Sequence, residues 1–150
     1  MTKFPDGPSS SPGFLLWHTT LRWQRAMAAA LAPHDLTHVQ FVILASTWWL
    51  NETGDRPNQA RLSEYTGSDA RMTSEVTRRL IAKGLLERAS DPSDARAKVL
   101  TVTPAGAEVA QKAITAVEAA DSTFFAAAPS ADVVPLLRAL ATGPGSVAFG

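Results

Sequence analysis

The first apolar pattern along the chain is helical and covers residues 14–32. Side chains with apolar surface recur at spacings of three and four, on one helix face: Leu16, Thr20, Trp23, Met27 and Leu31. A second apolar row lies beside the first: Phe14, Trp17 and Leu21. Pro33 ends the helix. A helix that is apolar on two sides has more surface to bury than the core of its own chain usually requires.

A second helix follows and begins with a capping box. Thr37 is suited to cap the first turn, and Gln40 stands three residues later, where its side chain can reach back to the cap. The stretch "FVILASTWWLN" continues this helix until Gly54. Because the stretch is apolar nearly all round, we expect it to form the central buried helix.

Residues 58–83 contain the pattern of two short helices. Asn58 caps "QARLSEYT", Gly67 breaks it, and Asp69 caps "ARMTSEVTRRLIAK", which Gly84 ends. In the second of these helices we expect Met72, Val76 and Leu80 to face inward, because they are spaced by four. Two helices joined by a short glycine-containing turn form a helix-turn-helix.

The hydrophobic period then changes to two, which is typical of strands. "LLERA" and "AKVLTVT" predict an antiparallel hairpin joined by "SDPSDAR". Thr103 and Pro104 begin a helix that continues to about residue 126, and Ser130 caps a final helix. The expected fold is mainly α with a small antiparallel β-hairpin, a winged helix-turn-helix, in which one further short strand fits before the helix at 59.

Composition and charge narrow the class of protein. Of 150 residues, 45% are hydrophobic and 19% charged, which is typical of one globular domain. The chain lacks cysteine, an apolar run of membrane-spanning length and a signal peptide pattern, so we expect a cytoplasmic protein. Its net charge is zero, yet residues 56–98 hold nine basic and six acidic residues, a local charge of +3. A basic module on an acidic body is one property of DNA-binding proteins.

The helix expected at 70–83 has a polar outer face suited to DNA. The candidate recognition residues are Ala70, Arg71, Ser74, Glu75 and Arg78. Arginine reads guanine in the major groove, and serine adds shorter hydrogen bonds. The alternative is an ordinary solvated helix in which Arg71 pairs with Glu75 one turn away.

The hairpin carries charge at and after its tip. Arg96 suits the negative potential of a minor groove, and Lys98 suits a phosphate. Asp94 stands two residues before Arg96, where it could orient the guanidinium. The alternative is that Asp91, Pro92, Ser93 and Asp94 are only turn formers.

Residues 60–106 resemble the MarR (multiple antibiotic resistance regulator) family of transcription factors. The likeness rests on "KGLLER" followed by "DPSDARAKVLTVTPAG", with "LTHVQFVIL" resembling the family's second helix. In order of helices it covers residues 14–142. It implies a homodimer whose helices at 14–32 and 104–142 intertwine, with a winged helix-turn-helix at about 37–103.

The resemblance also implies how DNA is bound. The helix at 70–83 would enter the major groove and Arg96 the minor groove, steadied by Asp94, on a pseudo-palindromic operator. We expect Asn58 and Arg61 to contact the DNA backbone. Glu75 departs from the family, which often has a basic residue there, so the operator preference should differ from that of typical members. The expected outcome of binding is repression.

Relatives of this type often release DNA when a small aromatic or phenolic anion binds. The corresponding region offers aromatic walls, a cation and histidines: Trp17, His18, Arg22, His38 and Phe41. The alternative is that the tryptophan belongs to a dimer core and the histidines are ordinary polar residues. The spacing of His18, His34 and His38 does not predict a metal site.

Other functions find less support. The chain has no glycine-rich phosphate loop, G-x-S-x-G or H-E-x-x-H motif, so we expect no catalysis and no cofactor other than such an effector. The remaining alternative is a winged helix that binds proteins without specific DNA. Residues 1–13 and 143–150, rich in Gly, Pro and Ser, predict disordered tails.

Overall fold

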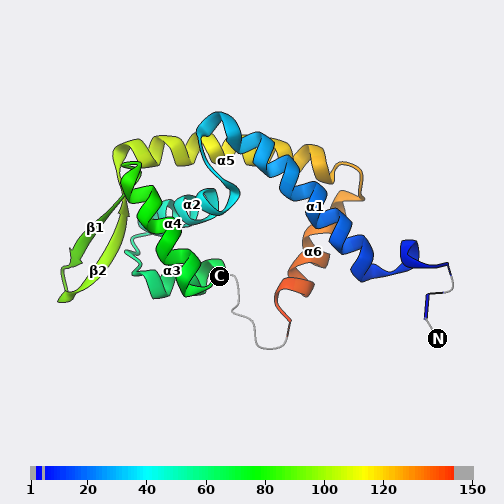
Figure 1. The fold of residues 1–150 in the computed structure, drawn as a ribbon, viewed down its shortest axis with the longest axis horizontal. Helices are drawn as coiled ribbons and strands as arrows, with labels where there is room; N and C mark the ends of the chain where they lie inside the picture. The colour runs from blue at the N-terminus through cyan, green and yellow to red at the C-terminus, as the bar shows by residue number, and fades with distance from the viewer. Residues whose placement is uncertain (1–2, 5, 144–150) are drawn as a thin grey trace.

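Ten short elements make up the computed structural model, which describes residues 3, 4 and 6–143. The helices are η1 (Pro8–Ser10), α1 (Pro12–Leu31), η2 (Ala32–His34), α2 (His38–Glu52), α3 (Gln59–Thr66), α4 (Ala70–Ala82), α5 (Pro104–Phe125) and α6 (Ser130–Ala141). The strands are β1 (Leu86–Asp91) and β2 (Asp94–Val102). Figure 1 shows an elongated molecule with the hairpin at one end, α1 and α6 at the other, and α5 joining them.

The N-terminal boundary differs from the prediction. Ser11 takes the N-cap position and Pro12 the first helical position, so α1 begins two residues before the predicted start at 14. The segment predicted to be a disordered tail also contains η1. At the other end, residue 143 follows the last helix, and the rest of the predicted tail, residues 144–150, lies outside the described residues.

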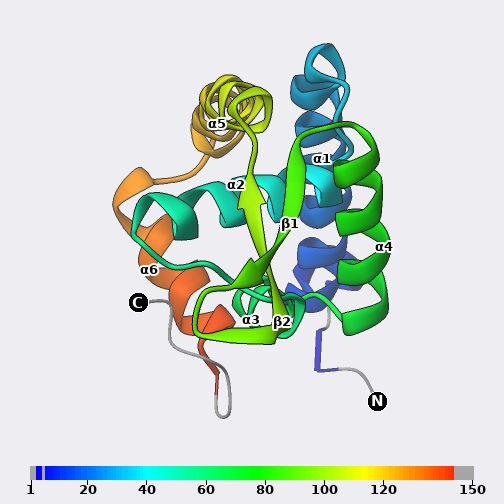
Figure 2. The ribbon, with the colours of Figure 1, turned by 90° about the vertical axis from the view of Figure 1, so that its left-hand side faces the viewer.

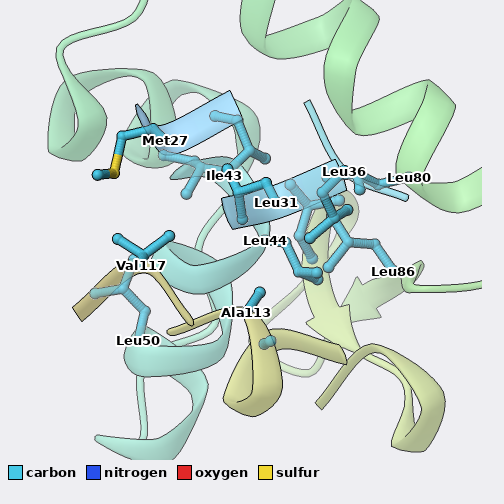
Figure 3. Close-up of a cluster of buried hydrophobic side chains, with 13 residues drawn as sticks. Met27, Leu31, Leu36, Ile43, Leu44, Leu50, Leu80, Leu86, Ala113 and Val117 are labelled. Carbon is cyan, nitrogen blue, oxygen red and sulfur yellow. The ribbon is translucent and has the colours of Figure 1, made fainter. Parts of the chain in front are cut away.

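Helix α2 lies at the centre, as its sequence predicts. Its capping box is complete: the Gln40 main-chain N–H donates to Thr37 Oγ1 and the Thr37 N–H donates to Gln40 Oε1, both at 3.2 Å. Every other large helix but α6 packs against it, and β2 does too. The resulting core is drawn in Figure 3 and consists of Met27, Leu31, Leu36, Ile43, Leu44, Leu50, Leu62, Leu80, Leu86, Leu100, Ala110, Ala113 and Val117.

The hairpin is longer and tighter than predicted. Asp91 pairs with Asp94, so Pro92 and Ser93 form the turn. The register shifts between Ser90, which pairs with Lys98, and Asp91, so residues 95–97 of β2 have no paired residue in β1. Arg96 therefore lies inside β2 and not at the tip. In Figure 2 the hairpin projects beyond the helices toward the viewer.

The short strand that could precede α3 does not form. Only one main-chain bond, from the Leu100 N–H to the Pro57 carbonyl at 2.8 Å, joins that segment to β2. The Asn51 side chain supplies further contacts: it donates to the Leu100 carbonyl at 3.3 Å and accepts from the Val102 N–H at 2.9 Å. An amide of α2 thus replaces part of the missing strand at the base of the hairpin.

Helix α5 begins where the backbone at 103–106 packs against the backbone at 84–85. Thr103 caps it, accepting from the Gly106 N–H at 3.0 Å, and the Thr103 hydroxyl donates to the Gly84 carbonyl at 2.6 Å. Gly106 faces the Leu85 carbonyl so closely that a Cβ at this position would lie 1.9 Å from that oxygen. Helix α6 starts at Ser130 with Pro129 in the N-cap position, one residue earlier than the capping prediction.

Candidate nucleic-acid interface

Helix α4, the predicted recognition helix, is fixed at its start by the capping residue Asp69. Asp69 accepts from the Met72 N–H at 2.8 Å, and its main-chain oxygen accepts from the Thr73 hydroxyl at 2.9 Å. The buried row consists of Thr73, Thr77 and Leu80. The predicted inward row is therefore wrong at Met72, which is 41% exposed, while Leu80 is buried and Val76 packs against the core as predicted. Thr73 and Thr77 are buried in place of Met72.

The outer face of α4 presents four of the five predicted recognition residues. Ala70, Arg71, Glu75 and Arg78 are exposed, and Ser74 is half-buried. Glu75 does not pair with Arg71, as the solvated-helix alternative had it, but with Arg79, at 3.0 Å. Within the described part of the chain no carboxylate lies within salt-bridge distance of Arg71 or Arg78. Their guanidinium groups remain available for a ligand outside the chain.

The hairpin turn is fixed by its two aspartates. Asp91 accepts from the Ser93 N–H at 2.9 Å and from the Ser93 hydroxyl at 2.8 Å, and these bonds lower the pKa of its carboxyl. Asp94 accepts from the main-chain N–H of Arg96 at 3.0 Å. This contact differs from the predicted brace, since the carboxylate holds the backbone and not the guanidinium. The Arg96 side chain is exposed.

A shallow hollow lies between the recognition helix and the hairpin. Its lining comes from four elements, α3, α4, β1 and β2: Gln59, Ser74, Arg88, Lys98 and Leu100. Lys98 also donates to the Ser90 hydroxyl at 3.2 Å. The cations of Arg88 and Lys98 and the neutral polar groups of Gln59 and Ser74 surround Leu100, and such a surface suits a phosphate.

Two polar residues of this hollow, Gln59 and Arg88, were not among the predicted site residues. In the strand register Arg88 faces Leu100, and Ser90 faces Lys98, so Arg88 and Lys98 are diagonal neighbours. The alternation of "LLERA" places Arg88 on the same face as Leu86, which was the available signal. The pairing that brings it to Lys98 depends on the register.

The residues predicted to contact the DNA backbone have partners within the chain. Asn58 caps α3 by accepting from the Arg61 N–H at 2.8 Å. The Arg61 side chain lies 3.5 Å from Asp55 and 5.6 Å from the centre of the Tyr65 ring. Their role at phosphates stays a prediction, which these local contacts do not test.

The structure does not bring the five predicted pocket residues together: Arg22, His38 and Phe41 lie where α1, α2 and α5 pack, whereas Trp17 and His18 are exposed on the N-terminal half of α1. Trp17 is 62% exposed on the N-terminal half of α1, and His18 packs edge-on against Phe14. Arg22 lies 5.9 Å from the centre of the Phe124 ring. His38 and Phe41 are half-buried on α2. None of these five residues lines the hollow beside α4, or a second hollow between η2, α2 and the end of α4 that is lined by Ala32, Asp35, Leu36, Thr37, Gln40 and Lys83.

His38 has its own cluster, which the sequence analysis did not foresee. Its ring meets Trp23 edge to face with the ring centres 4.9 Å apart, and Trp23 Nε1 donates to Asp121 Oδ1 at 2.8 Å. Burial lowers the pKa of the imidazole below its ordinary value of 6.5, and the Asp121 carboxylate offsets part of this effect. The packed region of α1, α2 and α5 therefore holds aromatic rings, a carboxylate and a histidine whose pKa is lowered.

No group of three or more His, Asp or Glu side chains among residues 3, 4 and 6–143 is placed to hold a metal ion. None of the helices in the described part of the chain is long and apolar enough to cross a membrane.

Known proteins resemble this chain in both sequence and structure. The model of the MarR family matches residues 36–98. An uncharacterised HTH-type transcriptional regulator, YdcH of Bacillus subtilis strain 168, is 45% identical over 127 residues, which are 85% of this chain and 86% of the relative.

Among solved structures, CouR from Rhodococcus jostii RHA1 bound to p-coumaroyl-CoA superimposes with a TM-score of 0.82 and 26% identity, over 95% of this chain and 99% of CouR. Bordetella bronchiseptica BpsR, whose DNA binding is regulated by 6-hydroxynicotinic acid, gives a TM-score of 0.80 and 25% identity, over 90% of this chain and 96% of BpsR.

Proposed function

The chain belongs to the MarR family of transcriptional regulators, and we propose that it acts in the cytoplasm as a homodimeric repressor on a pseudo-palindromic operator. The observation that carries the DNA-binding part is the juxtaposition of α4, Arg88 and the hairpin around one hollow. Helix α4 would lie in the major groove with Arg71, Ser74 and Arg78 toward the bases. Arg96 would reach the neighbouring minor groove.

Two surfaces support the homodimer. Helix α6 has little contact with any other described element, yet it exposes Val134, Leu136, Leu137 and Leu140. The N-terminal half of α1, which lies at the same end of the molecule in Figure 1, exposes Leu15, Leu16 and Trp17. The chain exposes 9994 Å² in total, whereas a compact monomer of 15.9 kDa exposes about 7,400 Å². A second copy of the chain would cover the apolar part of this excess.

The experiment that tests specific DNA binding is a titration against the DNA that flanks the protein's own gene, at two salt concentrations. A DNA binder shows log K falling steeply with log salt, because phosphate contacts release counterions. Sequence-selective binding with such a slope is the expected result. If no sequence is selected at low salt, the protein-interaction alternative is favoured.

The variant Arg88→Ala tests the phosphate hollow in the same titration. Arg88 is exposed, so we expect folding and dimerisation to be unchanged. The slope of log K against log salt should become shallower by about 0.9 for each protomer, since one phosphate contact is lost. Lys112→Ala, an equal charge change on α5, should leave the slope unchanged. A normal slope for Arg88→Ala would show that the hollow holds no phosphate.

We also propose that a small aromatic or phenolic ligand binds where α1, α2 and α5 pack together and weakens operator binding. The support is the group of rings around Arg22 and His38, together with the aromatic effectors of BpsR and CouR. An arginine among aromatic rings suits an aromatic carboxylate.

The probes for this effector site are 6-hydroxynicotinic acid and p-coumaroyl-CoA. We expect at least one of them to raise the melting temperature and to release the operator. Arg22→Ala should weaken that ligand about tenfold, the change that corresponds to one charged hydrogen bond. A ligand response that is independent of Arg22 would show that the ligand binds at another site. No response to either probe would count against this class of effector.

A further inference from the structure

The end of the recognition helix is tied to the start of α2. Lys83 takes the C-cap position of α4. Its ammonium lies 3.3 Å from Asp35 Oδ2, donates to Gln40 Oε1 at 3.2 Å and also contacts the Asp35 main-chain oxygen. We call these three residues, Lys83, Asp35 and Gln40, the Lys83 clasp. In the sequence Lys83 lies 43 positions after Gln40 and 48 positions after Asp35, so the clasp joins two separate parts of the fold.

The Gln40 side chain is the shared member of the clasp. Its Oε1 accepts both from the Thr37 N–H, which completes the capping box, and from the Lys83 ammonium. Gln40 is buried. One buried oxygen therefore holds the first turn of α2 and the last turn of α4 together.

Asp35 connects the clasp to α1. It ends η2, the short turn through which α1 passes into α2. With φ of 53° and ψ of 40° it is left-handed, and no other residue in the described part of the chain except glycine has a positive φ. Such a conformation persists where the surrounding structure determines it. Its main-chain oxygen and its carboxylate both contact Lys83.

We propose that Lys83 is a positioning residue, which sets the angle of the recognition helix relative to the dimerisation helix α1. The inference rests on the proposed entry of α4 into the major groove. In a dimer the two recognition helices must match half-sites about one helical turn apart, so a small rotation of α4 would weaken both contacts at once.

A direct phosphate contact by Lys83 is the competing explanation. Three oxygens of the chain already surround the ammonium, and the side chain is 31% exposed. Lys83 follows the last residue of α4, a helix of 13 residues, whereas Arg71 lies in its first turn. A helix of this length separates the two ends by about 20 Å. The two explanations differ in the salt dependence that they predict.

The experiment compares the operator affinity of full-length variants at several salt concentrations. We expect Lys83→Met to weaken operator binding about fivefold, since α4 would no longer be held at the angle that both half-sites require. The salt slope should be unchanged because no phosphate contact is removed. The melting temperature should change little, because the Asp35 carboxylate is almost fully exposed.

Three further variants complete the test. Lys83→Arg keeps the charge and should restore most of the affinity. Asp35→Asn tolerates the left-handed backbone and keeps the main-chain oxygen, so it should weaken binding less than Lys83→Met. Lys112→Met, which makes the same substitution at an exposed ion pair on α5, should bind like the wild type.

Three results would overturn the proposed positioning role of Lys83. They are an unchanged affinity in Lys83→Met, a salt slope shallower by about 0.9 for each protomer, and a lower melting temperature with normal affinity of the folded dimer. If Lys83→Met does not fold, normal affinity in Asp35→Asn overturns it. A wild-type protein that selects no operator would instead overturn the proposed role of α4 itself.

Discussion

Replacing Gly106 with alanine is expected to lower the free energy of unfolding by about 3 kcal/mol, as for severe overpacking. The new Cβ would lie 1.9 Å from the Leu85 carbonyl oxygen, 2.8 Å from the carbonyl carbon and 2.9 Å from Val102 Cγ1. Two of these atoms belong to backbone that cannot rotate away, and the Leu85 oxygen also accepts from the Thr103 N–H at 3.1 Å. The start of α5 and the start of the hairpin must therefore separate.

The measurement is denaturant unfolding at one fixed protein concentration, because the stability of a dimer depends on concentration. Gly13→Ala is the matched control. It makes the same change in α1, where a Cβ would meet no atom within 4 Å. It should be neutral or stabilise by up to about 1 kcal/mol, the helix preference of alanine over glycine. Wild-type stability in Gly106→Ala would contradict the packing described at the start of α5.

Replacing Arg96 with alanine is expected to weaken operator binding by about 100-fold. Each protomer would lose one charged contact in a minor groove, and the two losses add in the dimer. The Arg96 side chain is exposed, and its bond to Asp94 runs through the main chain, which alanine retains. Dimerisation and melting should therefore be unchanged.

Gel-shift or fluorescence titration of the operator measures this effect, with thermal melting alongside. Lys112→Ala serves as the control for loss of one positive charge away from the hairpin. If Arg96→Ala unfolds the protein, the hairpin arginine is structural. If the variant binds with wild-type affinity, Arg96 does not enter a groove.

The helix boundaries were predictable where a side chain caps the helix. Thr37, Asn58, Asp69 and Thr103 each accept from an N–H of the first turn. Such caps are local, so the sequence alone contains them. The start of α1 was placed too late because Ser11 and Pro12 lie in a segment whose composition predicts a tail.

The inner face of α4 shows where a hydrophobicity pattern fails. Met72 looks more apolar than Thr73, yet Thr73 is buried, since its hydroxyl donates to the Asp69 carbonyl and its methyl group is left to pack. A threonine whose hydroxyl bonds to the preceding turn behaves as an apolar residue in the core. The spacing alone could not tell which of the two adjacent rows turns inward.

The sequence alone predicts individual residues of the candidate site but not how they are grouped in space. The exposed arginines of α4 and Arg96 follow from local patterns, whereas Arg88 reaches the hollow only through the strand register. The contacts of Lys83 with Asp35 and Gln40 join positions more than forty residues apart, and no local pattern contains them. Tertiary geometry supplied these parts of the site.

The entry of α4 and the hairpin into adjacent grooves is tested most directly by methylation protection of the operator with dimethyl sulfate. This reagent marks guanine N7 in the major groove and adenine N3 in the minor groove. We expect two symmetric blocks of guanine protection, with centres about 10 base pairs or a multiple of this apart, each beside protected adenines in the neighbouring minor groove. Protection confined to one groove, or without two-fold symmetry, would contradict this arrangement.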